Sequence, residues 1–514
     1  MSLVKALEDV ARRQTAAPAL AWRGTKWTYG DLQAAIAAVD RGLTDRVLDP
    51  GARVALLLRN SPQYVAVYYG ALAAELVAVP LNVQERAPVL ARQIADSGAR
   101  LLIGDPAHPE WDRLIRALPR SSIDVLEFKL DDDGPASFRA LAAVFASIPR
   151  ERGDNDGSHA ANDHSALATI IYTSGTTGSP KGVMLSQENL RANARAIIAS
   201  LGLTARDHSL CVLPFHFSYG NSVLHSHLLC GACLTLEDNF AFPHVVLERL
   251  QSTRASGFAG VPSTFALLLG RHRLSGFDLG ALRYVTQAGG PMPRPLLDKL
   301  REQLPGIRVY LMYGQTEASA RLTCLPPHDL DRKPGSVGVP IGDVQIEIRD
   351  AGGVRPPPGA VGEIWARGPN VMLGYWNDPE ATAEVLSGGW LRTRDLGYVD
   401  EEGYLFIVGR ASDMIKVGAF RVSPQEVEEV LLGLDGVADA AVAGIQDDVL
   451  GQAIKAVVVP QHESQLTAMA VKAHCRENLA AYKVPKVVEF ATALPRTSSG
   501  KVQRFKLVGE APNR

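Results

Sequence analysis

The stretch from Tyr172 to Gly182, Tyr-Thr-Ser-Gly-Thr-Thr-Gly-Ser-Pro-Lys-Gly, constrains this chain more than any other. The apolar run 167–172 predicts a buried strand before it, and the residues from Ser186 onward predict the start of a helix. Its glycines allow tight turns whose N–H groups converge on phosphate oxygens, while hydroxyls and Lys181 add donors and charge. No Gly-Lys-Ser/Thr follows, so it is not a Walker loop. The pattern predicts a phosphate-holding loop of another kind, with an ordinary surface turn as the alternative.

The size and charge of the chain limit its class. At 514 residues it exceeds what one core organises, so two or more domains are expected. A net charge of −2 gives no basic field, which disfavours nucleic acid as a partner. The first residues lack a secretory pattern and the apolar run 64–74 is too short for a bilayer, so we expect a cytoplasmic protein without a membrane span. The sequence does not indicate an oligomeric state.

The five cysteines do not predict disulfides, because their number is odd and none precedes Cys211. Cys230-Gly-Ala-Cys233 has the spacing of a redox or zinc pair, but no second pair follows at ligand spacing. We expect two core cysteines on one strand.

Strands and helices alternate over most of the chain. Leu32, Ile36, Val39 and Leu43 share one helical face. The expected strands lie at 54–58, 77–80, 101–104, 210–213, 257–260, 283–287 and 308–312, and further helices at about 61–74 and 87–96. This order predicts parallel βαβ units in doubly wound sheets. A polar segment at about 129–165 is expected to be solvated.

The last third changes character. Glycine-rich short strands after Ile346 predict a β-rich subdomain. Ser423-Pro-Gln-Glu predicts a capping box with proline at the first helical position, followed by strands near 437–443 and 453–459 and a helix near 467–480. We therefore expect an α/β chain with an ATP- and acyl-binding domain over 1–410 and a small mobile α+β lid over 411–514.

Several downstream motifs share the order and spacing of one family. Tyr313-Gly-Gln-Thr-Glu combines an aromatic ring with oxygen donors that suit Mg²⁺, although alone it could begin a helix. Further motifs are Gln287-Ala-Gly-Gly-Pro, Arg392-Thr-Arg-Asp, Gly409-Arg410 and Pro495-Arg-Thr-Ser-Ser-Gly-Lys501. Together with the loop at 172–182, they make essentially the whole chain resemble the adenylate-forming superfamily, which includes acyl-CoA synthetases.

The resemblance implies roles for individual residues. Lys501 would be the adenylation lysine, offsetting charge on a pentacoordinate phosphate; Tyr313 would stack on adenine, Asp395 and Arg410 would hold the ribose, and Glu317 would contact the metal. The implied catalytic residues are Lys501, Glu317, His216 and Thr316. The implied cofactor-binding residues are Thr173, Ser174, Gly175, Thr176, Thr177, Gly178, Lys181, Gly289, Gly290, Pro291, Tyr313, Gly314, Asp395, Arg410 and Gly418. The implied metal ligands are Glu317 and Thr176.

The acid-binding pocket is implied at Tyr219, Gly220, Asn221, Val261 and Ala288. His216 stands where amino-acid-activating relatives carry an aspartate, which disfavours an α-amino acid. Each of these sites also has a purely structural interpretation: a core histidine for His216, a strand-ending turn for 287–291, and a surface ion pair for Asp395 and Arg410. One departure is Ser412, which occupies the family's hinge position, with Asp413 beside it.

The expected reaction uses ATP, Mg²⁺ and a carboxylic acid to form an acyl-adenylate, and then transfers the acyl group to a thiol. CoA is the favoured acceptor. The phosphopantetheine of a separate acyl carrier protein is the alternative, and a non-catalytic nucleotide-binding protein is a possibility of another class. Luciferase-like oxidation stays open. The sequence does not name the acid; aryl, hydroxylated and medium-chain groups are all compatible with Tyr219 and Asn221.

Overall fold

The structure is a computed structural model of the full chain. It describes residues 1–45, 48–119, 123–130, 167–173, 180–238, 240, 242–271, 274–418, 420–447, 450–461, 464–497 and 501–508. The expected solvated segment at 129–165 lies almost wholly outside these residues. Within them, no helix is both long and apolar enough to cross a membrane.

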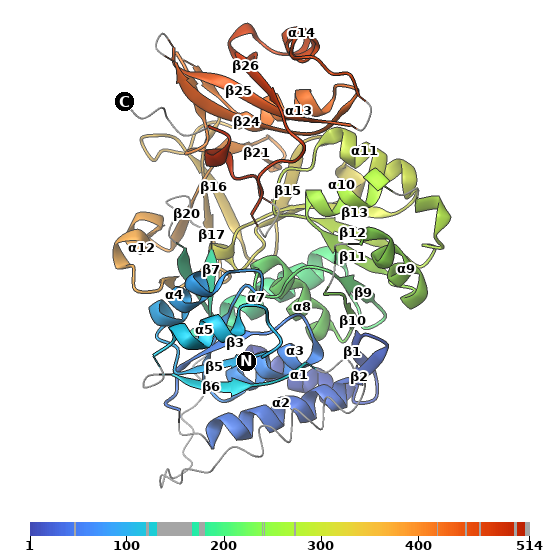
Figure 1. The fold of residues 1–514 in the computed structure, drawn as a ribbon, viewed down its shortest axis with the longest axis vertical. Helices are drawn as coiled ribbons and strands as arrows, with labels where there is room; N and C mark the ends of the chain where they lie inside the picture. The colour runs from blue at the N-terminus through green and yellow to red at the C-terminus, as the bar shows by residue number, and fades with distance from the viewer. Residues whose placement is uncertain are drawn as a thin grey trace.

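A seven-stranded sheet carries the first part of the chain (Figure 1). Its strand order is β18-β8-β7-β4-β3-β5-β6, and β3 to β6 are parallel. The strands are β3 (Arg53–Leu57), β4 (Val77–Pro80), β5 (Leu101–Gly104), β6 (Asp124–Glu127), β7 (Leu167–Thr173), β8 (Lys181–Ser186) and β18 (Gly374–Tyr375). The helices of this part are α3 (Pro62–Ala73), α4 (Ala87–Ser97), α5 (Trp111–Ala117) and α7 (Gln187–Leu201). The expected βαβ units are therefore present.

A fourteen-stranded sheet crosses the middle of the molecule, in the order β16-β17-β20-β21-β15-β14-β13-β12-β11-β9-β10-β1-β2, with β19 beside β20. Its first strands are β1 (Pro18–Trp22), β2 (Thr25–Thr28), β9 (His208–Cys211), β10 (Cys233–Leu236), β11 (Gly257–Gly260), β12 (Tyr284–Gln287) and β13 (Arg308–Tyr313). The later ones are β14 (Thr323–Leu325), β15 (Ser336–Pro340), β16 (Gln345–Arg349), β17 (Gly362–Arg367), β19 (Leu386–Ser387), β20 (Trp390–Val399) and β21 (Leu405–Arg410). The β-rich part thus extends the central sheet through antiparallel pairing of β15 with β14 and β21.

The remaining helices of this region are α1 (Leu3–Arg13), α2 (Tyr29–Thr44), α8 (Ser218–Cys230), α9 (Pro243–Thr253), α10 (Pro262–Arg271), α11 (Arg294–Gln303) and α12 (Pro379–Val385). The sequence did not predict α1, and for α2 it predicted only one apolar face. Short 3-10 turns occur at η1 (Leu274–Gly276), η2 (Thr316–Ala318) and η3 (Pro327–Asp329). The largest hydrophobic core lies under α1 to α3, α7 and α8.

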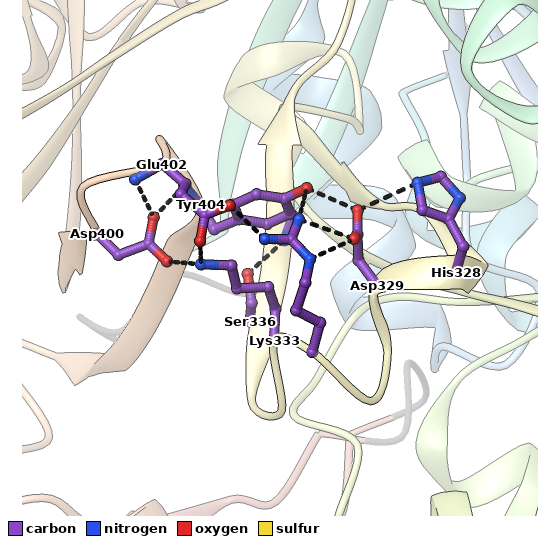
Figure 2. Close-up of polar contacts among 9 residues, drawn as sticks. His328, Asp329, Lys333, Ser336, Asp400, Glu402 and Tyr404 are labelled. Atoms are coloured by element: carbon purple, nitrogen blue, oxygen red, sulfur yellow. Dashed lines mark hydrogen bonds and ion pairs between the residues drawn. The ribbon is translucent and has the colours of Figure 1, made fainter.

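A polar cluster joins the loop after η3 to the β20–β21 turn (Figure 2). Lys333 Nζ lies 2.6 Å from Asp400 Oδ2, and the Tyr404 hydroxyl donates to Asp329 Oδ2 at 2.6 Å. Arg332 donates to Asp329 and to Glu402. The cluster therefore ties the connection between β14 and β15 to the turn between β20 and β21.

The C-terminal residues form a separate five-stranded sheet in the order β23-β22-β25-β24, with β26 paired to β25 (Figure 1). Its elements are β22 (Ile415–Val417), β23 (Phe420–Val422), α13 (Pro424–Leu432), β24 (Val437–Asp447), β25 (Gly451–Pro460), α14 (Ala468–Asn478), η4 (Ala481–Lys483), β26 (Val487–Phe490) and η5 (Arg504–Lys506). They enclose their own apolar core.

Three local expectations need correction. The stretch 181–186 forms the unexpected strand β8, because its apolar residues pair with β7 before α7 begins. Cys230 ends α8 and only Cys233 is on a strand, since Gly231 turns the chain at φ 82°. Ser423 precedes α13 but does not cap it with its side chain; instead its hydroxyl donates to the Val408 carbonyl at 2.6 Å.

Candidate active site

The predicted phosphate loop connects the two strands of the antiparallel β7–β8 pair, in which Thr173 lies opposite Lys181. Residues 174–179, including the predicted Ser174, Gly175, Thr176, Thr177 and Gly178, lie outside the described residues. Lys181 Nζ lies 3.5 Å from Asp378 Oδ2 and 5.0 Å from the ring centre of Tyr375. Lys181 is therefore held at the base of the loop.

Thr316 and Glu317 lie on η2, directly after β13. Glu317 Oε1 accepts a hydrogen bond from the Tyr375 hydroxyl at 2.9 Å, and the Thr316 and Ser218 hydroxyls are 3.0 Å apart. Gly314 is required here, because a Cβ would lie 1.9 Å from the carbonyl oxygen of Ala320. The turn thus places a carboxylate and a hydroxyl, both with oxygen atoms that can bind a cation, at the end of the central strand β13.

The donor set at this turn fits a Mg²⁺ ion. Carboxylate and hydroxyl oxygens are hard ligands, and Mg²⁺ usually takes one or two protein carboxylates together with phosphate oxygens and water. The described part of the chain contains no group of three or more His, Cys, Asp or Glu that could hold a metal. Glu317 and Thr316 supply one carboxylate and one hydroxyl oxygen of the kind that Mg²⁺ binds.

Asp395 and Arg410 face each other across β20 and β21. Arg410 Nε donates to Asp395 Oδ1 at 2.9 Å, and the Tyr313 hydroxyl donates to Asp395 Oδ2 at 2.6 Å. Asp395 is only 6% exposed, so the alternative of a surface ion pair does not describe it. The Tyr313 ring is thereby fixed at the end of β13. The Arg410 side chain is 40% exposed to solvent.

The charges of this cluster support one another. Burial acts against the charge of Arg410, but Asp395 and Glu317 outweigh it and raise the pKa of the guanidinium. Burial, followed by the Asp395 charge, raises the pKa of the Tyr313 hydroxyl, which therefore stays a donor.

Lys501 belongs to the C-terminal part of the chain, and the charges of this cluster act on it. It sits on a hairpin in which Arg496 pairs with Val502 and the Thr497 N–H donates to the Lys501 carbonyl at 2.7 Å. Burial and then Arg410 lower the pKa of Lys501, whereas Glu317 and Asp395 act in the opposite direction. The residue keeps contact with solvent, which limits the size of this shift. Lys501 is thus within electrostatic range of three predicted site residues from the rest of the chain.

Two arginines anchor the Lys501 hairpin. Arg496 Nη2 donates to Asp439 Oδ2 at 2.6 Å. Arg504 Nη2 donates to both carboxylate oxygens of Glu428, at 2.8 Å each. The hairpin is therefore tied to β24 and α13 on both sides of Lys501.

The predicted acid pocket gathers around the start of α8. Burial lowers the pKa of His216 to about 3, so its imidazole is neutral, and its Nε2 has no partner among the described residues. The Tyr219 hydroxyl lies 2.9 Å from Thr286 Oγ1 at the end of β12. Gly220 allows α8 to approach the preceding loop, since a Cβ would lie 2.3 Å from the Pro214 carbonyl oxygen. Asn221 is buried, and its Nδ2 also lacks a partner in the part of the chain that is described.

The loops after β11 and β12 form the side of this region. A Cβ on Gly289 would lie 3.2 Å from Val261 Cγ1, so these two loops are in close contact. Ala288 is buried, while Gly289, Gly290 and Pro291 are exposed, and Gln287 Nε2 donates to the Gly290 carbonyl at 2.7 Å. The loop thus presents a surface with few bulky side chains beside the acid pocket.

The structure does not bring every predicted residue to one place. Gly418 follows β22 and donates its N–H to the Leu450 carbonyl at 2.8 Å, within the C-terminal sheet. At the predicted hinge, the Ser412 hydroxyl donates to Asp413 Oδ1 at 2.9 Å, and Asp413 Oδ2 lies 3.6 Å from Arg504 Nη1. Asp413, rather than Ser412, is therefore connected to the Lys501 hairpin.

Several residues of the site were missed from the sequence. Tyr375 binds Glu317 across 58 positions of sequence, and no local pattern marks it. Ser218, whose hydroxyl lies 3.0 Å from that of Thr316, was also missed. Arg504 could have been found, because it follows Lys501 within the same C-terminal motif.

Comparisons with known proteins show the family of the chain. A family model described as "AMP-binding enzyme" matches residues 7–376, and one described as "AMP-binding enzyme C-terminal domain" matches residues 426–501. A feruloyl-CoA synthase from Amycolatopsis is 35% identical over 493 residues, which cover 96% of this chain and 95% of the relative.

Two solved structures are also similar. The anthranilate CoA ligase AuaEII in complex with anthranoyl-AMP has a TM-score of 0.88 and 27% identity, covering 99% of this chain and 96% of that one. The o-succinylbenzoate CoA synthetase MenE from Bacillus subtilis, in complex with ATP and a magnesium ion, has a TM-score of 0.85 and 29% identity, covering 98% of each chain.

Proposed function

The chain belongs to the AMP-binding enzyme family and is an AMP-forming acid–thiol ligase, and we propose how its residues divide the reaction into two steps. In the first step, a carboxylate oxygen attacks the α-phosphorus of ATP, the bond to the bridging oxygen breaks, and pyrophosphate leaves with the electron pair. In the second step, a thiolate sulfur attacks the acyl carbon and AMP leaves, which gives a thioester.

One observation carries the division of roles: Lys501 lies within electrostatic range of Asp395, Arg410 and Glu317. A phosphoryl transfer of this kind needs positioning and charge stabilisation more than covalent chemistry. We assign Lys501 to the negative charge that builds up in the first step. Asp395 and Arg410 would hold the ribose, and the fixed ring of Tyr313 would lie against the adenine.

The phosphate end of the nucleotide belongs to the β7–β8 loop and to η2. Thr173 and the loop residues that follow would hold the departing pyrophosphate, and Lys181 would orient the loop from its base. Glu317, Thr316 and Thr176 would hold Mg²⁺, which neutralises phosphate charge when it is bound. Tyr375 would keep the Glu317 carboxylate in place.

We propose that residues 1–410 bind ATP and the acid, and that residues 411–514 act as a lid. With Lys501 beside the large domain, the arrangement suits the first step. Rotation about Ser412 and Asp413 would withdraw Lys501 and bring Lys416, Val417 and Gly418 to the arm of the thiol substrate. His216 would gate the acid as a neutral ring.

CoA is the proposed thiol, because the relatives compared above are CoA synthases and ligases. The phosphopantetheine of a separate carrier protein is the second candidate, and we expect the reaction to take place in the cytoplasm. Supplying CoA or a phosphopantetheinylated carrier protein to the same reaction separates the two acceptors by the thioester formed.

The test of the proposal is pyrophosphate release with a panel of acids that includes ferulate, anthranilate, 2-succinylbenzoate and octanoate. We expect release that depends on ATP, Mg²⁺ and at least one acid, followed by AMP and a CoA thioester. A protein that binds ATP but releases neither pyrophosphate nor AMP with any of these acids would be a non-catalytic nucleotide-binding protein, and the proposal would be wrong.

A further inference from the structure

Arg321 is a buried cation that the reaction described above does not use. It follows η2, where Ser319 and Ala320 have φ angles of 56° and 110° and turn the chain inward before β14. Its side chain is among the largest that are fully buried. A guanidinium is rarely buried without a partner, because taking the charge out of water is costly unless an anion or hydrogen bonds compensate it.

The contacts of Arg321 do not balance its charge. Its Nη1 donates to the thioether sulfur of Met312, and its guanidinium carbon lies 5.2 Å from the ring centre of Tyr219. Among the described residues its Nε has no hydrogen-bond partner, and the ionisable groups that act on its charge are Tyr219 and Cys324, not an Asp or Glu. A cation–π contact and a thioether are weak substitutes for a carboxylate.

The two nearest ionisable groups are also neutral. Burial raises the pKa of the Tyr219 hydroxyl to about 12 and that of the Cys324 thiol to about 11, although Arg321 acts against both shifts. Neither group is an anion near neutral pH. Among the described residues, no negative charge therefore balances Arg321.

Arg321 adjoins the proposed acid pocket. Tyr219, whose ring it faces, is held by Thr286 at the end of β12 and belongs to the start of α8. The neighbouring Ser218 contacts Thr316 on η2, and Met312 precedes Tyr313 on β13. The three elements that surround the guanidinium are thus those that present the acid to the nucleotide.

We propose that Arg321 sets the substrate class: the acid carries a second carboxylate, at the end away from the reacting one, and this group pairs with the Arg321 guanidinium. The inference rests on the proposed function, because Arg321 adjoins residues of the same proposed acid pocket. A planar guanidinium offers a carboxylate two parallel N–H donors, which a neutral acceptor or a methyl group cannot use equally well.

The test compares acids that differ only at the far end. One series is 4-carboxycinnamate, 4-hydroxycinnamate and 4-methylcinnamate; the other is octanedioate, its monoamide and octanoate. Pyrophosphate release is measured as kcat/KM for the wild type and for Arg321→Met and Arg321→Lys. In at least one series, the wild type should prefer the dicarboxylate over the methyl-ended acid by about 10-fold to 100-fold, as expected for a charge-assisted pair.

Arg321→Met should remove this preference while retaining release with the methyl-ended acid, and Arg321→Lys should keep part of it. Met has a similar length and leaves no charge to bury, so the melting temperature of Arg321→Met should not fall. Three results would overturn the proposal: no dicarboxylate preference in the wild type, a preference for the phenol or amide alone, or an equal loss with every acid in Arg321→Met.

The two hypotheses fail in different ways. If the wild type releases pyrophosphate with the methyl-ended acids but does not favour the dicarboxylates, the role of Arg321 is wrong and the proposed function stands. If it releases neither pyrophosphate nor AMP with any acid of either series or of the wider panel, the proposed function fails and this inference fails with it.

Discussion

Arg504 holds the hairpin that carries Lys501, so its replacement by Met tests whether the anchor matters. Arg504 Nη2 donates to both oxygens of Glu428 at 2.8 Å, and its Nε donates to the Val442 carbonyl at 3.2 Å. Glu428 is 9% exposed, and its other bond is from the Val442 N–H at 2.8 Å. In Arg504→Met, this buried carboxylate loses its only cation partner among the described residues.

The size of the effect follows from the burial. Removing one partner of a buried ion pair costs about 3–5 kcal/mol. The Arg504 side chain retains 26% exposure, and water can partly replace it. We therefore expect the lower end, about 3 kcal/mol, which corresponds to about 100-fold in an opening equilibrium.

Hydrogen exchange is the suitable assay, because a chain with two domains need not unfold in one step. Amides of β24 and β25 should lose about 100-fold of their protection in Arg504→Met, while amides of β12 and β13 should not change. Arg476→Met is the matched control: Arg476 is exposed on α14 and forms no ion pair with any described residue.

The pH dependence has a defined sign. Burial raises the pKa of Glu428, and Arg504 acts against this shift, so the variant should raise that pKa further. A protonated Glu428 needs no cation, and the loss of protection should therefore be smaller at about pH 5 than at about pH 8. ATP–pyrophosphate exchange should fall through kcat, with little change in the KM for ATP. Equal protection of β24 and β25 in the Arg504 and Arg476 variants would refute the reasoning.

Three further predictions concern the site. Lys501→Ala should lower ATP–pyrophosphate exchange by at least about 100-fold while largely sparing thioester formation from supplied acyl-adenylate, and equal loss of both steps would contradict its assignment. Glu317→Gln should shift the Mg²⁺ titration of pyrophosphate release to higher concentration, since the amide still accepts the Tyr375 bond but carries no charge; an unchanged titration would count against the metal role. Because its surroundings lower the pKa of Lys501, adenylation should decline with rising pH before an ordinary lysine would lose its proton, and Lys501→Arg should move that decline upward.

Local patterns predicted the parallel part of the fold well. The strand at 101–104 has the predicted bounds, and α7 begins directly after Ser186, whose hydroxyl accepts from the Asn189 N–H at 3.1 Å. Such features depend on residues a few positions apart, and apolar periodicity records them. The strand β8 was missed because its six residues follow a polar loop and acquire their pairing only from β7.

The candidate site was predictable where a family motif is contiguous. The charges of Asp395, Arg410 and Glu317 act on Lys501 in the folded chain, and the adenylation role that the resemblance implies for Lys501 stays a prediction. The partners that hold the site were not predictable. The Tyr375–Glu317 and Arg504–Glu428 bonds join residues 58 and 76 positions apart, and nothing in either local sequence specifies its partner.

The sequence by itself predicted a phosphate-holding loop at 172–182, and it determined the alternation of strands and helices and the family. These properties come from glycine and hydroxyl content and from periodicity, which act locally along the chain. Only the tertiary structure decided that Lys181 is held by Asp378, that Asp395 is buried under Tyr313 and Arg410, and that no described carboxylate balances Arg321. Charge balance depends on which strand ends meet in space, and that is a property of the folded molecule alone.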